Sequence, residues 1–196
     1  LKRVAIYERA WNARKCKPAG EDIIDALIAA ADLGVELGEH VVAADLWRRA
    51  QAVAERVKSS DLAKIEERQP AFDARVEAER QAKALAERLK DEPREAESRR
   101  KLRTLYLVEL DHPSEAMRFL DPADEESLKT NIPLAVQPVG KQSEESALRL
   151  AEWYVGLADT AGIGGKELML ARAMRCYARF FDIHAGRDDL LAMRAA

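Results

Sequence analysis

Residues 21–50, EDIIDALIAAADLGVELGEHVVAADLWRRA, decide the fold of this chain. Apolar residues recur there at the three- and four-residue steps of an amphipathic helix, on both sides of Gly38. Glycine commonly ends a helix, so the pattern predicts one helix over 21–37 and a second over 39–57. Two helices joined by about two residues must run antiparallel, so the stretch predicts a helical hairpin.

The segments on either side of this hairpin also have a helical pattern. A helix is predicted over 2–15, ended by Pro18-Ala19-Gly20, and together with the hairpin it forms N-terminal hairpins over 1–58. Residues 59–90 predict a long charged helix with a thin apolar line, in which Pro70 indicates a kink or a break near Gln69. Such a helix either packs by one edge or forms an intermolecular coiled coil.

The remaining residues, 94–196, predict C-terminal hairpins. The expected helices cover 94–110, 115–120, 122–130, 143–161, 166–184 and a last stretch from 188, with a loop over 132–142. No segment alternates between apolar and polar residues with the period of two that a strand requires. The sequence therefore predicts an all-α class and one domain over 1–196.

Successive helical hairpins indicate a superhelical stack of the tetratricopeptide kind. Small residues at fixed offsets allow two helices to approach closely, and an aromatic residue packs against the next pair. The matching positions are Ala30, Ala31, Gly34, Gly38, Ala43, Trp47 and Ala50, and a second partial match uses Leu150, Ala151, Tyr154, Ala173, Tyr177 and Phe180. The alternative is an irregular helical bundle, because no strict 34-residue period is present.

The composition excludes several functional classes. The chain has 196 residues, of which 47% are hydrophobic, 6% aromatic and 34% charged, with a net charge of −3. This apolar content excludes a disordered chain, and no apolar run reaches the ~18 residues of a membrane span. The near balance of charge disfavours a dedicated nucleic-acid binder, which is normally strongly basic.

The segment from Arg99 to Tyr177 resembles an uncharacterised family of Ala-rich helical proteins that is abundant in planctomycete-type bacteria. The similar residues are Leu102 to Leu107, Ala116 to Leu120, Leu128, Trp153-Tyr154, Leu157-Ala158, Arg172-Ala173 and Cys176-Tyr177, and less specifically Leu33 to Trp47. The chain departs from the family at Leu110-Asp111-His112-Pro113, where Gly-Asp-Trp is usual. The resemblance implies a helical interaction region outside the cytoplasm, periplasmic or extracellular, and it supplies no catalytic residues. The first residue is Leu1 rather than Met, which fits either a removed signal or a trimmed chain.

No catalytic or metal-binding constellation is recognisable. His40, His112 and His184 each stand alone at a helix end or turn, and no HExxH or CxxC spacing occurs. Catalysis by nucleophile or acid and base needs convergent side chains, which this pattern does not supply. We therefore expect no enzyme, no cofactor and no metal.

Two local patterns resemble ligand sites but have simpler explanations. Gly162-Ile163-Gly164-Gly165-Lys166 lacks the preceding strand and the Ser or Thr of a phosphate-binding loop, so it predicts the turn of a hairpin. The basic cluster Arg99-Arg100-Lys101 with Arg103 is surrounded by glutamates, which favours a solvated helix face over a nucleic-acid contact.

The sequence favours a non-catalytic domain that binds a protein or a peptide on a face of stacked helices. Two alternatives remain: a structural spacer or self-associating region, and a helical domain that binds a small ligand near His112 or the 132–142 loop. Cys176 lies in an apolar stripe, so a free buried thiol is expected, with a bridge to Cys16 as the alternative.

Overall fold

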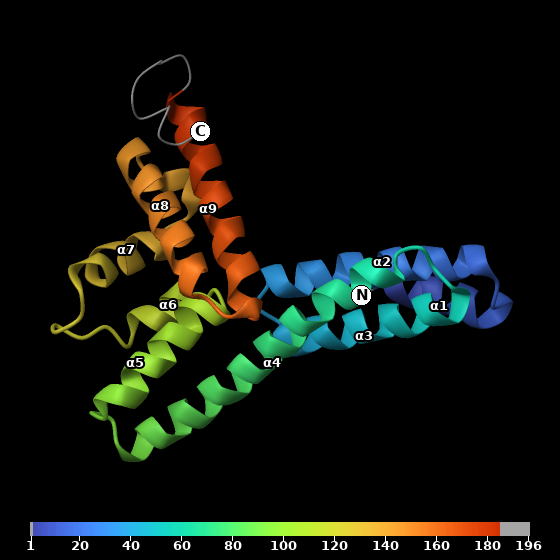
Figure 1. Ribbon diagram of the computed structural model, residues 1–196, viewed down its shortest axis with the longest axis horizontal. Helices are drawn as coiled ribbons and strands as arrows, with labels where there is room; N and C mark the ends of the chain where they lie inside the picture. The colour runs from blue at the N-terminus through green and yellow to red at the C-terminus, as the bar shows by residue number, and fades with distance from the viewer. Residues whose placement is uncertain (1, 185–196) are drawn as a thin grey trace. The chain divides into compact units, whose positions relative to one another are not determined.

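The structure, a computed structural model, describes residues 2–184. Every regular element in this range is a helix and no strand occurs in it, so the predicted all-α class is confirmed (Figure 1). The elements are α1 (Lys2–Arg14), α2 (Lys17–Glu36), α3 (His40–Val57), α4 (Leu62–Asp91), α5 (Ala96–Thr104), the π-helix η1 (Leu105–Glu109), α6 (Pro113–Met117), α7 (Glu126–Val136), the 3₁₀-helix η2 (Val139–Lys141), α8 (Glu144–Thr160) and α9 (Ile163–His184). The helix expected from Asp188 lies outside the described residues.

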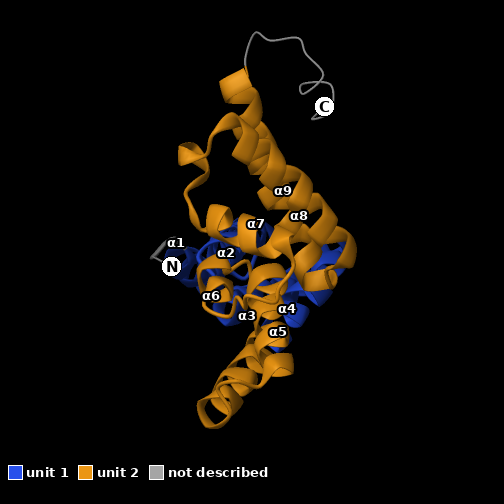
Figure 2. Cartoon of the chain, turned by 90° about the vertical axis from the view of Figure 1, so that its left-hand side faces the viewer, with its two compact units in different colours: residues 1–77 blue, residues 78–196 orange. Residues whose placement is uncertain are grey.

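The chain divides into two compact units, residues 1–77 and residues 78–196 (Figure 2). The boundary falls inside α4, and apolar residues of this helix pack in the cores of both units. Its first half, with Ile65 and Phe72, belongs to the core of unit 1, and its second half, with Ala82 and Leu89, belongs to a core of unit 2. The prediction of one domain over 1–196 stays a prediction.

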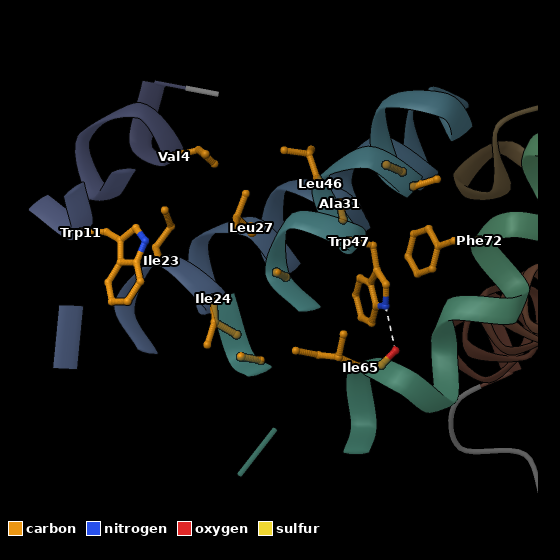
Figure 3. Packing of buried hydrophobic residues seen from close by; sticks show 14 of the residues in the cluster. Val4, Trp11, Ile23, Ile24, Leu27, Ala31, Leu46, Trp47, Ile65 and Phe72 are labelled. Carbon is orange, nitrogen blue, oxygen red and sulfur yellow. Dashed lines mark hydrogen bonds between the residues drawn. The ribbon is translucent and has the colours of Figure 1, made fainter. Parts of the chain in front are cut away.

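The core of unit 1 is the hairpin of α2 and α3 with α1 and the start of α4 packed on it (Figure 3). Close approach of the two hairpin helices depends on small residues. A Cβ added to Gly34 would lie 3.1 Å from the Ala43 Cβ, and Ala31, Ala43 and Ala50 are fully buried. The antiparallel hairpin expected from residues 21–57 is therefore present.

Trp47 is the largest fully buried side chain in this core. Its ring stacks on Phe72 with centroids 4.5 Å apart, and its Nε1–H donates a hydrogen bond of 2.9 Å to the carbonyl oxygen of Ile65 (Figure 3). The bond satisfies the indole donor inside an apolar environment, where an unpaired donor would be costly. This contact joins α3 to α4 within unit 1.

Three prolines were misjudged from the sequence. Pro18 does not end α1, which stops at Arg14. It lies instead in the first turn of α2, where the missing N–H costs nothing. Of the kink or break expected near Gln69, the break is wrong, because α4 continues through Pro70 from Leu62 to Asp91, and the kink stays a prediction. Pro133 lies inside α7, so the predicted loop over 132–142 begins only after Val136.

Unit 2 contains the hairpin of α8 and α9, which lie side by side (Figure 1). Ser143 caps α8, since its hydroxyl accepts a hydrogen bond of 3.3 Å from the Ser146 N–H. The helix expected over 94–110 is instead α5 followed by η1, and the helix expected over 122–130 starts only after Glu125. There Asp121 accepts a bond from the Ala123 N–H and forms a turn rather than a helix cap.

Candidate protein-binding surfaces

One face of α9 carries a row of five apolar side chains, four of which are exposed. The row, called the α9 stripe, consists of Ile163, Leu170, Met174, Tyr177 and Phe181. Their spacing of seven, four, three and four residues places all five on one side of the helix. Met174 is 71% exposed, Ile163 61%, Phe181 41% and Leu170 40%, while Tyr177 is half-buried. Exposed apolar side chains grouped on one helix face mark an interaction surface more often than scattered apolar residues do.

A second face of α9 packs against α8. Met169, Ala173, Cys176 and Phe180 are buried there. Leu170 follows Met169 in the same apolar pattern, which predicts an inward side chain, but the structure leaves it exposed. The signal for two faces was present: the apolar residues of α9 span an arc too wide for one packing partner.

The end of the α2–α3 hairpin in unit 1 is also apolar and exposed. Leu33 and Leu37 come from the C-terminal end of α2, and Val41 and Val42 from the first turn of α3. Leu33, Leu37 and Val42 continue the apolar pattern of their helices, and that pattern alone predicts burial. Their exposure corrects that prediction and shows that the pattern extends beyond the buried length of the hairpin.

Unit 2 has a pocket of about 400 Å³ between α5 and the segment that leads into α7. Its walls include Arg99, Arg100 and Arg103 on one side and Asp121 and Glu125 on the other. Phe119 also lines the pocket, with the Arg99 guanidinium 5.8 Å from its ring centroid. Opposite charges therefore line a pocket that sequence reasoning did not anticipate.

Arg103 shows why the basic cluster is only partly a solvated face. Its side chain is 6% exposed and forms an ion pair with Asp124, which also accepts a bond of 2.6 Å from the Asp121 N–H. Burial opposes ionisation of the Asp124 carboxyl, but these bonds and the Arg103 charge outweigh it and hold its pKa below the usual value. Arg103 thus closes one wall of the pocket as a paired charge.

The glycine-rich segment at the start of α9 is hydrogen-bonded to a carboxylate of the chain itself. The Gly162 N–H donates a bond of 2.8 Å to Oε1 of Glu109, at the end of η1. A Cβ at Gly165 would lie 2.5 Å from the Val108 carbonyl oxygen, so the glycine is needed for the helix to approach η1. The turn is shorter than expected, since α9 already begins at Ile163. Glu109 occupies the anion position at this helix end.

A partly buried ion pair joins Asp111, the second residue after the π-helix, to α9. Asp111, whose φ is 54°, accepts bonds of 2.8 Å at both carboxylate oxygens from Nε of Arg172. Burial raises the pKa of the Asp111 carboxyl despite the attraction of Arg172.

Burial also raises the pKa of the Tyr154 phenol, and it raises the pKa of the Cys176 thiol to about 11. The Tyr154 phenol and the Cys176 thiol are thus held protonated in the interior, which suits packing rather than reaction with solvent.

The three histidines lie in different segments of the two units. His40 is buried at the start of α3 in unit 1. In unit 2, His112 precedes α6 and stacks on Tyr106, while His184 stacks on Phe180 at the end of α9 and contacts the Glu144 carboxylate through Nδ1. Each imidazole is thus placed by local packing.

Cys16 is exposed and Cys176 is buried, and both are free thiols. Within residues 2–184, no three His, Cys, Asp or Glu side chains are grouped as metal ligands would be. No helix in the same range is long and apolar enough to cross a membrane. No protein-family model, no curated protein and no solved structure matches this chain.

Proposed function

We propose that this chain is a non-catalytic helical domain that binds another protein or peptide through the α9 stripe. The observation that carries the proposal is the row of four exposed apolar side chains along one helix, with Met174 the most exposed of them. Burying such a row against a partner helix removes it from water, which is the main favourable term in most protein association. The geometry suits a partner with apolar residues at helical spacing.

The tetratricopeptide-like arrangement and the relation to the Ala-rich planctomycete-type family form part of the same proposal. Two antiparallel hairpins, α2–α3 and α8–α9, supply the repeated element that such a stack needs. Small residues at their contacts, such as Gly34 against Ala43, support close helix packing of that type. Proteins built in this way present helix faces for binding rather than catalytic groups.

A second candidate function is the binding of a small ligand in the pocket beside α5. The observation that favours it is the volume of about 400 Å³, within the range of ligand sites, together with arginines facing acidic residues. A ligand that carries both charges would match these walls. Calorimetric titration with zwitterionic and anionic compounds, compared between the unchanged protein and Arg100→Ala, tests this alternative.

The main proposal is tested by selecting helical peptides from a displayed library on the immobilised full chain. We expect the selected peptides to have apolar residues at steps of three and four, and to lose about tenfold or more in affinity for Met174→Glu. The matched control is Met117→Glu, because Met117 is also an exposed methionine of unit 2 but lies on α6. Peptides that bind both variants equally well, or the absence of any selected peptide, would refute a function of the α9 stripe.

A further inference from the structure

One face of α5 forms a wall of the pocket in unit 2. Ala96, Arg99, Arg100 and Arg103 line it, and their three- and four-residue steps place them on one side of the helix. Arg103 is the buried member and is paired with Asp124. Within residues 2–184, neither Arg99 nor Arg100 forms an ion pair. Two guanidinium groups therefore border the pocket without a carboxylate partner in this range.

The opposite wall carries two carboxylates in the same state. Glu125 precedes the first turn of α7, yet its side chain does not cap that helix. One oxygen of Asp121 accepts a bond from the Ala123 N–H. Neither carboxylate has an ion pair in the part of the chain that the structure describes, so Glu125 and Arg100 lie farther apart than the ~4 Å of such a pair. The pocket thus separates charges of opposite sign.

Bonds within the chain hold the two walls together. Nη1 of Arg103 donates to the Asp124 carboxylate, and it also donates a bond of 3.4 Å to the carbonyl oxygen of Phe119. Asp124 in turn accepts a bond from the Asp121 N–H. These contacts join α5 to the segment before α7 without help from a ligand. Binding in such a preformed pocket requires little additional ordering of the chain.

Apolar side chains complete the lining. Phe119 and Leu128 both border the pocket and are half-buried. The Phe119 ring stacks on Tyr106 with centroids 6.0 Å apart, and the Arg99 guanidinium lies 5.8 Å from its centroid. These neighbours fix the ring at the edge of the pocket. A ligand would therefore bury an apolar group there, beside the charged groups of both walls.

We infer that the pocket binds a small zwitterion that carries a carboxylate, an ammonium group and one apolar group, as apolar amino acids and dipeptides do. The inference rests on the second candidate function and names the class of its ligand. The carboxylate would accept bonds from Arg99 and Arg100, while the ammonium group would donate to Glu125 and Asp121. The volume of about 400 Å³ is near the lower end of ligand sites, which suits a ligand of this size.

The balance of charge favours a zwitterion over a simple anion. Three arginines and three acidic residues line the pocket, and the pair of Arg103 with Asp124 leaves two of each sign. An anion would be attracted by the two remaining arginines and repelled by the two remaining carboxylates. A cation would meet the reverse. A zwitterion can place each of its charges beside the wall of opposite sign.

The exposure of the charged groups sets the strength of binding. Arg100, Asp121 and Glu125 are exposed, so water and salt screen their charges. We expect a dissociation constant between about 10 µM and about 1 mM, as is common for small ligands with few buried contacts. The affinity should fall as the salt concentration rises, because both charged contacts weaken.

Calorimetric titration of the full chain with L-phenylalanine and alanyl-phenylalanine tests the inference. Two matched compounds each lack one charge: N-acetyl-phenylalanine has no ammonium group, and phenylalanine methyl ester has no carboxylate. Each should bind about tenfold or more weakly than phenylalanine, because one pair of charged wall groups is left without its partner. The tighter of the two zwitterions identifies whether an amino acid or a dipeptide fits the pocket. Equal binding of phenylalanine and either matched compound overturns the inference.

Variants of the two walls assign the contacts. Arg100→Ala should weaken phenylalanine binding about tenfold and leave the methyl ester unaffected, because the ester has no carboxylate to lose. Glu125→Ala should do the same for phenylalanine and leave the N-acetyl compound unaffected. Lys101→Ala and Glu126→Ala are the matched controls, since both side chains are exposed neighbours outside the lining. Circular dichroism checks that each variant is folded. Controls that lose as much affinity as the wall variants overturn the inference.

The outcomes distinguish this inference from the candidate function on which it rests. If N-acetyl-phenylalanine binds as tightly as phenylalanine and Arg100→Ala abolishes both, the zwitterion is refuted and the pocket remains a ligand site. If none of the four compounds binds, the inference is overturned, and failure of the wider set of zwitterionic and anionic compounds refutes the candidate function as well. Met174→Glu should leave every titration unchanged, because α9 does not line the pocket.

Discussion

Replacing Gly165 with alanine tests the close approach of α9 to η1 in unit 2. The added Cβ would lie 2.5 Å from the Val108 carbonyl oxygen and 2.9 Å from Oε2 of Glu109. Among the glycines of the described residues, only Gly38 is recorded with a positive φ, so the backbone at Gly165 accepts alanine and the whole penalty is steric. Because the first obstacle is backbone, which cannot rotate away as a side chain can, α9 must move away from η1.

The expected loss in the free energy of unfolding follows from opposing terms. Overpacking of a close contact costs up to about 3 kcal/mol, and alanine returns up to about 1 kcal/mol through its higher helix propensity. The net loss is therefore about 2 kcal/mol, which lowers the urea midpoint by about 1 M at an m-value of ~2 kcal/mol/M.

Gly156→Ala is the matched control, because Gly156 lies in the adjacent helix α8 and a Cβ there meets nothing within 4 Å. This variant should gain up to about 1 kcal/mol from helix propensity alone. Urea unfolding followed by circular dichroism at about 222 nm, where helices absorb, measures both. If Gly165→Ala were as stable as the unchanged protein while Gly156→Ala gained stability, the close approach of α9 to Val108 would be wrong.

Three further predictions concern polar groups that are buried or partly buried. Asp111→Ala should lower the free energy of unfolding by about 2–4 kcal/mol in urea melts, because Arg172 keeps its charge without this carboxylate; an unchanged midpoint would contradict the ion pair. Trp47→Phe should cost about 1–3 kcal/mol in the same assay, since the Ile65 carbonyl loses its buried donor. The thiol of Cys176 should resist iodoacetamide in the native state and react only in denaturant, whereas the exposed cysteine reacts in both, with mass spectrometry counting the labels. Burial raises the pKa of the Cys176 thiol from 9.0 to about 11. The contribution of the protonated thiol to the free energy of unfolding is therefore complete below pH 9 and is lost as the pH rises through 11.

The α2–α3 hairpin illustrates how far local sequence reasoning reaches. Its two helices, its turn at Gly38 and the close packing of small residues such as Gly34 and Ala43 were all expected from residue spacing. Such features depend on neighbours a few residues apart, which the sequence displays directly. Leu37 shows the limit of reasoning from spacing. Its place in the apolar pattern predicts burial, but the side chain is 69% exposed.

The prolines and the turn after α5 were harder to predict. Pro70 and Pro133 lie inside helices because packing along the rest of each helix outweighs one missing hydrogen bond. The π-helix η1 and the left-handed Asp111 have no local sequence signature, since they are fixed by contacts with α9. Partners 61 residues apart cannot be read from spacing.

The candidate surfaces also depend partly on local sequence and partly on tertiary packing. The sequence by itself determined that the chain is helical, where most helices lie, and that α9 is rich in apolar residues, because the three- and four-residue periodicity is a local property. Only the tertiary structure decided which of those residues are buried against α8 and which form the exposed stripe, and which arginines and acidic residues line the pocket beside α5. Burial depends on which distant segments occupy each face of a helix, and that choice is made by the packing of the whole unit.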